Sequence, residues 1–410
     1  MADSRVVLIG VFVLVTCHCV SAGDIYVDSS NNMTNPDGTL ANPYPTISAG
    51  YQKAKDGDRV IINKGNGYFP TQNLFVNLAV DFVGNIDLED GQADLPVIDL
   101  SQLDDNSFFW WNPTYGEYPT EANVAGSISN LEITNGNFQA KAGLCNGAAL
   151  RISTGYFTVS NMKFTSNVAC NGGAIYVETF NNHTADVVIE NSVFTKNSAV
   201  MNTNNANGNG GAIYIETKST SKRYLTSIRN CQFFENKAGK GGAIYSADSS
   251  FVVIGSTFTE NEAEFSSGTT GYGGAIFMNG DKEVLSEVEI VRCGFTSNKA
   301  GIYAGAVGII GGYLQIVSTS FQANSVTQTG GQYGGALDVS GVMDAYDCVF
   351  SGNTFATGSN GKGRVGKKDP LFISLPAECS GRLFVTCHMM SSICLFVLLF
   401  FFLCRWGPLH

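Results

Sequence analysis

Aromatic residues recur at one position of a repeated pattern, each directly after an isoleucine. They are Tyr176, Tyr214, Tyr245 and Phe277. Two residues further on stand two carboxylates, Glu178 and Glu216. Flat rings beside carboxylates suit sugars, which present apolar faces and hydroxyl groups, although such rings also stack on one another to stabilise a sheet. The column therefore predicts either a glycan-binding face, exposed to solvent, or a structural ladder.

The two glutamates are also candidates for catalysis. A retaining glycoside hydrolase needs two carboxyl groups about 5–5.5 Å apart, and equivalent positions on stacked strands could approach that separation. A polysaccharide lyase would instead need clustered aspartates for calcium, and no such cluster stands out in the sequence. A repeated glutamate is more simply a solvated surface position. We therefore expect no catalysis, no metal site and no cofactor.

Cysteine spacing predicts one disulfide. Cys145 and Cys170 each stand two residues before the first glycine position of a repeated motif, on consecutive repeats. Equivalent positions on stacked strands lie about 4.8 Å apart, within the Cα window of about 4.4–6.8 Å for a disulfide. Three further cysteines share another column with one repeat between each pair, and we expect them to remain buried thiols. They are Cys231, Cys293 and Cys348.

All these residues take their places from a repeat in which Phe-x-x-Asn is followed, after a variable gap, by Gly-Gly-Ala-Ile-Tyr. Clear copies begin at Phe164, Phe194, Phe233 and Phe258, and worn copies begin at Phe295, Phe321 and Phe350. Self-similarity of this kind indicates a stacked array whose units contact mainly their neighbours.

One coil of the array can be decoded from the columns around each phenylalanine. Aliphatic residues stand seven and five residues before it, with the period of two that predicts a strand with one buried face. The next column in step lies two residues before the phenylalanine, so the chain must bend between them. The bend carries residues that tolerate left-handed backbone geometry and whose amides could hydrogen-bond along the stack. They include Asn130, Asn161, Asn191, Asn230 and Gly255.

A further strand follows each gap, so the pattern predicts coils of three short strands in a right-handed parallel β-helix. We assign residues 23–358 to this all-β fold, with clear repeats over 126–353. Residues 46–54 are expected to form a short helix that covers the first coil, whose open strand edges would otherwise invite aggregation. Residues 80–125 are expected to form irregular coils. The aromatic run 108–111 is either a buried cluster or a surface patch.

The two ends of the chain differ from the repeats. Residues 1–22 are predicted to be a secretory signal, with Arg5, an apolar run and small residues at the cleavage site. Residues 359–382 are expected to be a linker, 383–404 an apolar segment and 405–410 a short tail. We favour one membrane span with the repeats outside. There are two alternatives: a cleaved lipid-anchor signal near Ser380-Gly381, or a C-terminal sequence that does not belong to the native protein and results from an error in the gene model.

Composition narrows the choice of partners. The chain has 410 residues, of which 14% are charged, and a formal net charge of −11, whereas nucleic-acid binding requires clustered lysine and arginine. Asn32 and Asn182 stand in sequons for N-glycosylation in a secreted chain. We therefore expect a carbohydrate or cell-surface partner, no nucleic acid, and a place in the secretory pathway, at the cell surface or outside the cell.

The motifs Phe-x-x-Asn and Gly-Gly-Ala-Ile resemble the passenger repeats of chlamydial-type polymorphic outer-membrane proteins. The opening of the chain is similar to that of many pectate-lyase-like β-helix proteins. The resemblance implies a surface-displayed, adhesin-like β-helix. A linker and an apolar tail stand where that family has an outer-membrane barrel, which suits a eukaryotic surface protein. Three functions stay open: adhesion or glycan binding, which we favour, a polysaccharide-active lyase or hydrolase, and a structural coat component.

Overall fold

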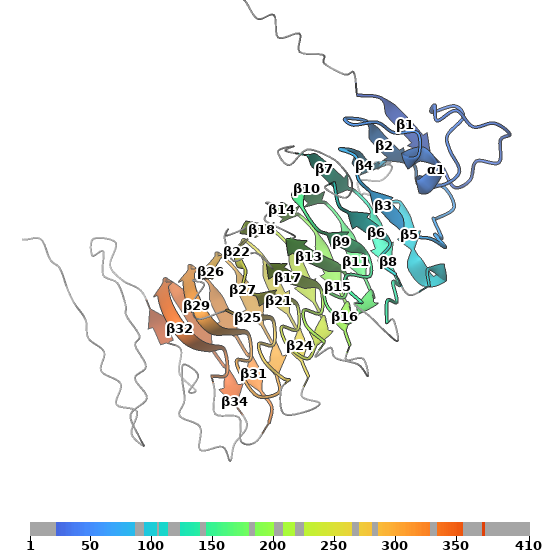
Figure 1. Cartoon of the computed structure of the whole chain (residues 1–410). Coiled ribbons are helices and arrows are strands. Elements are labelled where there is room, and N and C mark those ends of the chain that lie inside the picture. The colour runs from blue at the N-terminus through green and yellow to red at the C-terminus, as the bar shows by residue number, and fades with distance from the viewer. Residues whose placement is uncertain are drawn as a thin grey trace, which may run out of the picture.

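The computed structural model describes residues 22–86, 94–104, 106–113, 124–139, 145–179, 185–200, 208–217, 225–264, 270–280, 286–328, 334–355 and 371–373. Within these ranges the chain is a right-handed parallel β-helix, as predicted, and its coils stack along one axis (Figure 1). Residues 1–21, the apolar segment 383–404 and the tail lie outside the described residues. No helix within the described ranges is both long and apolar enough to cross a membrane.

Each complete coil contains four short parallel strands, one more than the sequence predicted. In one coil these are β13 (Ile175–Thr179), β14 (Ala185–Glu190), β15 (Val193–Thr195) and β16 (Ser198–Ala199). The fourth strand has only two residues. Its buried residue is an alanine in five of the coils and a valine in a sixth. So short an element with so small a side chain leaves no clear hydrophobic pattern, which is why the sequence did not reveal it.

The strands form four sheets that run along the helix, here called the first to the fourth sheet. The first sheet contains β3 (Leu74–Val76), β6 (Phe109–Trp111), β9 (Leu150–Ile152), β13, β17 (Ile213–Thr217), β21 (Ile244–Ala247), β25 (Ile276–Asn279), β29 (Val307–Val317) and β32 (Leu337–Tyr346). The second contains β1 (Asp24–Val27), β2 (Arg59–Ile62), β4 (Asp81–Gly84), β7 (Ala125–Ser129), β10 (Gly155–Ser160), β14, β18 (Leu225–Arg229), β22 (Ser250–Ile254) and β26 (Glu287–Val291). The two sheets join through the long strands β29 and β32.

The other two sheets are narrower. The third sheet contains β5 (Val97–Asp99), β8 (Glu132–Thr134), β11 (Lys163–Thr165), β15, β19 (Gln232–Phe234), β23 (Thr257–Thr259), β27 (Gly294–Thr296), β30 (Ser320–Gln322) and β33 (Cys348–Ser351). The fourth contains β12 (Val168–Ala169), β16, β20 (Lys237–Ala238), β24 (Glu262–Ala263), β28 (Lys299–Ala300), β31 (Ser325–Val326) and β34 (Thr354–Phe355). Within the predicted linker, β35 (Leu371–Ile373) pairs antiparallel with β33 and extends the third sheet.

The predicted inward columns form the core. Phe164, Phe194 and Phe258 are fully buried, and the phenylalanines of successive coils stack almost parallel. For example, the rings of Phe233 and Phe258 have centroids 4.6 Å apart and planes 2° apart. The isoleucines of the first sheet pair in register from coil to coil and are equally buried. The repeat therefore stabilises the fold mainly through contacts between neighbouring coils.

Two left-handed corners shape each coil. The first is where the sequence placed it, with positive φ angles at Asn130, Asn161, Asn191, Asn230 and Gly255. The second lies two residues after each phenylalanine and was not predicted, because the residue type there varies from coil to coil. It includes Ser166, Lys196, Glu235 and Glu260.

The principal amide ladder lies at the asparagine of Phe-x-x-Asn and not at the first corner, where we expected it. Asn197 donates from Nδ2 to Oδ1 of Asn236 (3.0 Å) and to the carbonyl of Phe164 (2.9 Å). The same pattern continues from Asn167 to Asn353. Among the described first-corner asparagines, one amide contact occurs, at 3.4 Å between Asn230 and Asn191. The inner ladder is buried, so it satisfies backbone groups that water cannot reach.

The Gly-Gly pair permits neighbouring coils to approach closely. Gly172 has a φ of +56°, a geometry that side chains rarely adopt. A Cβ atom on Gly173 would lie 2.2 Å from the carbonyl oxygen of Gly211 on the next coil. Any other residue would therefore push the two coils apart.

The N-terminal end is closed by the predicted helix, α1 (Ile47–Tyr51), which contacts β1 and β2 (Figure 1). Thr46 caps this helix by accepting a hydrogen bond from the amide of Ala49 at 3.1 Å. Residues 80–125 include strands β4 to β6 and a short 3-10 helix (Leu100–Gln102). In the aromatic run 108–111, Phe108, Phe109 and Trp111 are buried in the core.

Candidate functional site

The four aromatic residues of the predicted column stack on the outer side of the first sheet. The ring centroids of Tyr176 and Tyr214 are 5.1 Å apart, and those of Tyr214 and Tyr245 are 5.0 Å apart. Phe277 continues the row, 6.0 Å from Tyr245. All four side chains are buried, with exposed fractions from 2% for Tyr176 to 8% for Tyr214. The expectation of an exposed ladder is therefore wrong, because rings that stack this closely cover one another's faces.

The stack extends further toward the N-terminus than the motif indicated. Phe75, Trp110 and Arg151 occupy the same register position on the three preceding coils of the first sheet. The guanidinium of Arg151 lies 4.5 Å from the centre of the Trp110 ring, and Phe75 meets Trp110 edge-on at 5.2 Å. Alternation with the buried Leu74 and Val76 indicates that Phe75 lies on the outer side of the sheet. The repeated motif did not reveal this part of the stack, because β3 and β6 are not preceded by Gly-Gly-Ala.

Glu178 lies in a buried polar network beside this stack. Its Oε1 accepts hydrogen bonds from Nε (2.9 Å) and Nη2 (2.7 Å) of Arg151 and from Oγ of Ser153 (2.9 Å). Ser153 in turn accepts from the indole nitrogen of Trp110 at 2.9 Å. The side chain of Glu178 is 1% exposed, so the expectation of a solvated position is wrong here. A buried carboxylate requires a paired cation, and Arg151 supplies it.

Glu216 stands in register with Glu178 on the next coil and has a different partner. Its Oε2 accepts a hydrogen bond from the hydroxyl of Tyr176. Burial, together with the nearby charge of Glu216, raises the pKa of Tyr176 and of Tyr214. Burial likewise raises the pKa of Tyr245 to about 12. The three phenols are therefore neutral at physiological pH, and that of Tyr176 donates its hydrogen to Glu216.

The structure thus brings the two catalytic candidates onto adjacent coils but engages each of them within the protein. A retaining hydrolase needs one carboxyl to attack the sugar and a second to donate a proton. Here Arg151 and Ser153 hold Glu178, while Tyr176 holds Glu216. Within the part of the chain that the structure describes, no group of three or more His, Cys, Asp or Glu side chains is placed to hold a metal ion.

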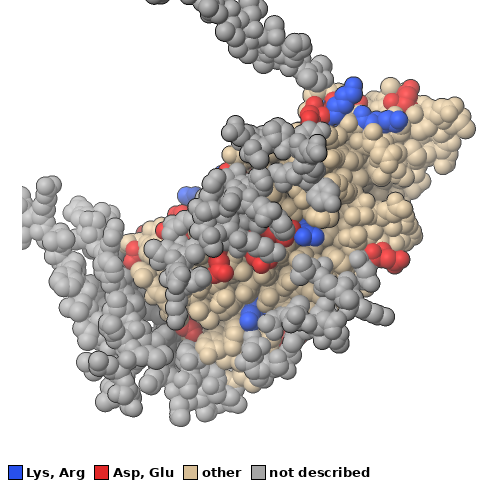
Figure 2. All heavy atoms as spheres, viewed as in Figure 1, with Lys and Arg blue, Asp and Glu red and all other residues tan. Residues whose placement is uncertain are grey.

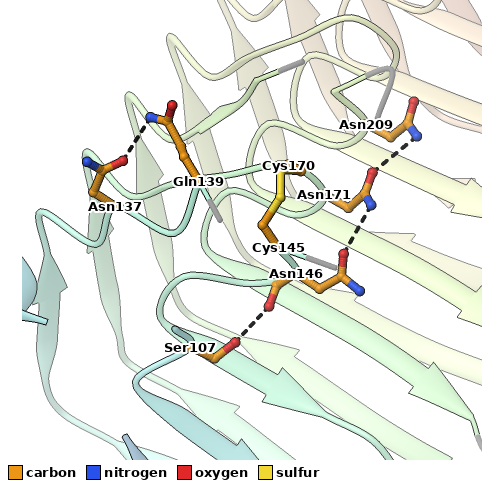
Figure 3. The surroundings of a disulfide bond; sticks show 8 residues. All are labelled: Ser107, Asn137, Gln139, Cys145, Asn146, Cys170, Asn171 and Asn209. Atoms are coloured by element: carbon orange, nitrogen blue, oxygen red, sulfur yellow. Dashed lines mark hydrogen bonds between the residues drawn. A yellow bond between two sulfur atoms is a disulfide. The ribbon is translucent and has the colours of Figure 1, made fainter. Parts of the chain in front are cut away.

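The predicted disulfide is present between Cys145 and Cys170, whose Cα atoms are 5.1 Å apart on neighbouring coils (Figure 3). Beside it, the amides of Asn146, Asn171 and Asn209 form a row along the coils, with hydrogen bonds of 3.0 and 3.2 Å. The other three predicted thiols are free and buried, as expected. Burial raises the pKa of Cys231 to about 12 and that of Cys293 to about 11.

Two predicted glycosylation sites and the distribution of charge on the surface remain. Asn32 is exposed, whereas Asn182 falls outside the described residues. On the face drawn in Figure 2, lysine and arginine are interspersed with aspartate and glutamate, with no continuous basic surface among the residues described there.

Comparison with known proteins identifies the repeat. The Chlamydia polymorphic membrane protein repeat matches residues 161–178, 191–216 and 230–247. The chain therefore carries repeats of this type, as the motifs predicted. No curated protein matches the chain in a sequence comparison.

Several solved structures match most of the chain at low sequence identity. A rhamnogalacturonan lyase matches with 14% identity and a TM-score of 0.46, over 84% of this chain and 85% of that one. The pectate lyase Pel9A matches with 13% identity and a TM-score of 0.45, over 85% and 81%. A GH136 lacto-N-biosidase from Eubacterium ramulus matches with 12% identity and a TM-score of 0.40, over 85% and 67%.

Proposed function

We propose that this chain, a parallel β-helix with polymorphic-membrane-protein repeats, is a secreted or cell-surface adhesion protein that binds glycans without cleaving them. One observation carries the proposal: the outer surface repeats in register. Outward-facing residues of successive coils pair in register in the third and fourth sheets, for example Thr165 with Thr195 and Thr259 with Thr296, and these threonines are partly exposed. A long surface made of similar units suits repeated weak contacts with a polymer or with a second cell, because linked contacts raise the overall affinity.

The two candidate carboxylates are not free to act as a catalytic pair. Glu178 is buried and paired with Arg151, and Glu216 accepts a hydrogen bond from the hydroxyl of Tyr176. Catalysis would require a carboxylate with access to substrate and a second group able to give up a proton. Fold alone does not decide function, since many activities share one architecture.

A glycan array, probed with the full-length protein made in a secretory host, tests the proposal. We expect retention of at least one class of glycan, with heat-denatured protein as the control. The retained glycan should be recovered intact after prolonged incubation, without release of reducing ends. A protein that retains no glycan would contradict the proposal. A protein that releases new reducing ends would instead be a polysaccharide-active enzyme.

A further inference from the structure

A polar groove crosses the fourth sheet beside the second left-handed corner. Its volume is about 420 Å³, which lies in the range of small-ligand sites. Its ionisable lining residues come from four coils and comprise three lysines and three glutamates. They are Lys196, Glu235, Lys237, Glu260, Glu262 and Lys299. Because the opposite charges are equal in number, the groove has no net attraction for a polyanion or a polycation.

Four of the six charges neutralise one another across neighbouring coils. Lys196 lies 3.5 Å from Glu235, and Lys237 lies 3.2 Å from Glu262. The hydrogen bond and charge of Glu262 raise the pKa of Lys237, and partial burial offsets only part of this rise. The ammonium group of Lys237 therefore stays charged. Such exposed pairs contribute little to stability, about 0–1 kcal/mol each. They do fix the positions of the side chains that line the groove.

The other two charges are available to a ligand. Glu260 and Lys299 are both exposed, and neither has an ion-pair partner among the described residues. Glu260 can accept hydrogen bonds from hydroxyl groups, and Lys299 can donate to hydroxyl or carbonyl oxygens. A hydroxyl-rich ligand can satisfy both groups at once.

The groove rests on a rigid support. Asn197, which also lines it, is fully buried and belongs to the inner asparagine ladder. Directly before Glu235, Phe234 is 36% exposed on the third sheet, where it pairs in register with Thr195 and Thr259. An exposed ring beside hydroxyl groups offers a sugar an apolar platform next to the charged groove. Among the lining residues, Lys237, Glu262 and Lys299 lie on strands of the fourth sheet, and side chains on regular strands keep their geometry better than side chains on loops.

We propose that this groove is the glycan site of the protein and that it takes an uncharged oligosaccharide. The inference rests on the proposed function and names its ligand class. Hydrogen bonds from sugar hydroxyls to Glu260 and from Lys299 to sugar oxygens are charge-assisted and therefore stronger than neutral ones. Charged oligosaccharides would place a like charge next to one of these two groups.

The test measures binding of four oligosaccharides to the full-length protein: cellotetraose and chitotetraose, which are uncharged, tetragalacturonate, which is anionic, and a chitosan tetramer, which is cationic. We expect an uncharged tetramer to bind at least about tenfold more tightly than either charged one. The double variant Glu260→Gln, Lys299→Met should weaken that binding by about tenfold or more, since it removes two charge-assisted hydrogen bonds.

A matched control changes one glutamate and one lysine outside the groove. Glu132 and Lys163 pair in register on the third sheet, and the double variant Glu132→Gln, Lys163→Met should bind like the unmodified protein. A thermal melt of each variant verifies that it is folded.

Binding that survives unchanged in the groove variant would overturn the groove as the site while leaving glycan binding intact. Preference for a charged tetramer would overturn the ligand class. Absence of binding to all four tetramers would overturn the proposal of an uncharged oligosaccharide ligand. Whether the protein binds any glycan is decided separately by the array.

Discussion

Arg151 donates two hydrogen bonds to one carboxylate oxygen of Glu178, at 2.9 and 2.7 Å, and so joins two neighbouring coils. The side chain of Glu178 is 1% exposed and that of Arg151 is 21% exposed. The same guanidinium covers the ring of Trp110 at 4.5 Å. One arginine therefore links the buried ion pair to the aromatic stack on the outer side of the first sheet.

Removal of the arginine should destabilise the protein strongly. In Arg151→Met the carboxylate of Glu178 stays buried without its cation, which typically costs about 3–5 kcal/mol. Urea denaturation measures the loss, with the exposed Lys163→Met as the control that should change stability by less than about 0.5 kcal/mol. Adding Glu178→Leu to Arg151→Met should recover part of the loss, since it removes the buried charge. A loss below about 1 kcal/mol for Arg151→Met would show that the pair is solvated.

The inner asparagine ladder should tolerate substitution poorly. Asn236→Ala leaves the amide of Asn197 and the carbonyl of Phe194 without their partners in a buried position, at a cost of about 3 kcal/mol or more. Asn191→Gly is the matched control. Asn191 lies at the exposed first corner with a φ of +50°, and glycine adopts that geometry readily, so we expect a change below about 1 kcal/mol. Equal losses for the two variants in chemical denaturation would contradict the distinction between ladder and corner.

The sequence predicted the fold and the inward columns because both depend on local periodicity. A period of two that slips by one residue requires a bend, and asparagine at Asn130 or Asn161 identified that bend. The second corner could not be found in this way, since its left-handed position is occupied by residues as different as Ser166, Lys196 and Glu235. There the inner asparagine ladder and the tight turn fix the backbone, whatever the side chain.

The site was predictable only in part. Alternation with isoleucine determines on which side of a sheet Tyr214 lies, but it does not determine what covers that side. The ion pair of Arg151 with Glu178 runs diagonally, between register positions that differ by two residues on adjacent coils. The groove around Glu260 and Lys299 likewise depends on side chains from different coils. Such relationships follow from the stacking of coils and cannot be read from one repeat.

Alkaline pH should unfold the protein as the buried tyrosines ionise. Burial raises the pKa of Tyr245 to about 12 and also raises those of Tyr176 and Tyr214. The unfolded chain therefore loses these protons first, near the ordinary phenol pKa of about 10. The stabilisation is complete below about pH 10 and is lost as the pH rises through the folded-state pKa values.

The ultraviolet absorbance of tyrosinate and circular dichroism should report this as a coincident transition above about pH 10. Tyr245→Phe should move the transition to higher pH, because one ionising group is removed from the buried stack. Tyr156→Phe, at a residue that is 39% exposed, should leave it in place. Ionisation of the stacked tyrosines in a protein that stays folded would contradict their burial.

The five cysteines among the described residues should divide into one bonded pair and three unreactive thiols. Peptide mapping of the non-reduced protein should recover Cys145 linked to Cys170. Reduction of this bond, which spans 25 residues, should lower the free energy of unfolding by about 3 kcal/mol. The double variant Cys145→Ser, Cys170→Ser should show no such response to reductant.

A thiol reagent should modify Cys231 and Cys293 only after denaturation, since burial raises the pKa of each thiol. A peptide linking Cys231 to Cys293 would contradict the register of the coils.

Calorimetric titration tests the central claim most directly, because one heat signal separates binding from turnover. Cellotetraose and chitotetraose are injected in separate titrations into the full-length protein at constant temperature. We predict heats that saturate and return to the baseline after each injection, as expected for a protein that binds a glycan and leaves it intact. A continuous heat that persists until the sugar is consumed would contradict the claim and would indicate an enzyme. The absence of heat for both tetramers, together with the absence of any glycan retained on the array, would contradict glycan binding itself.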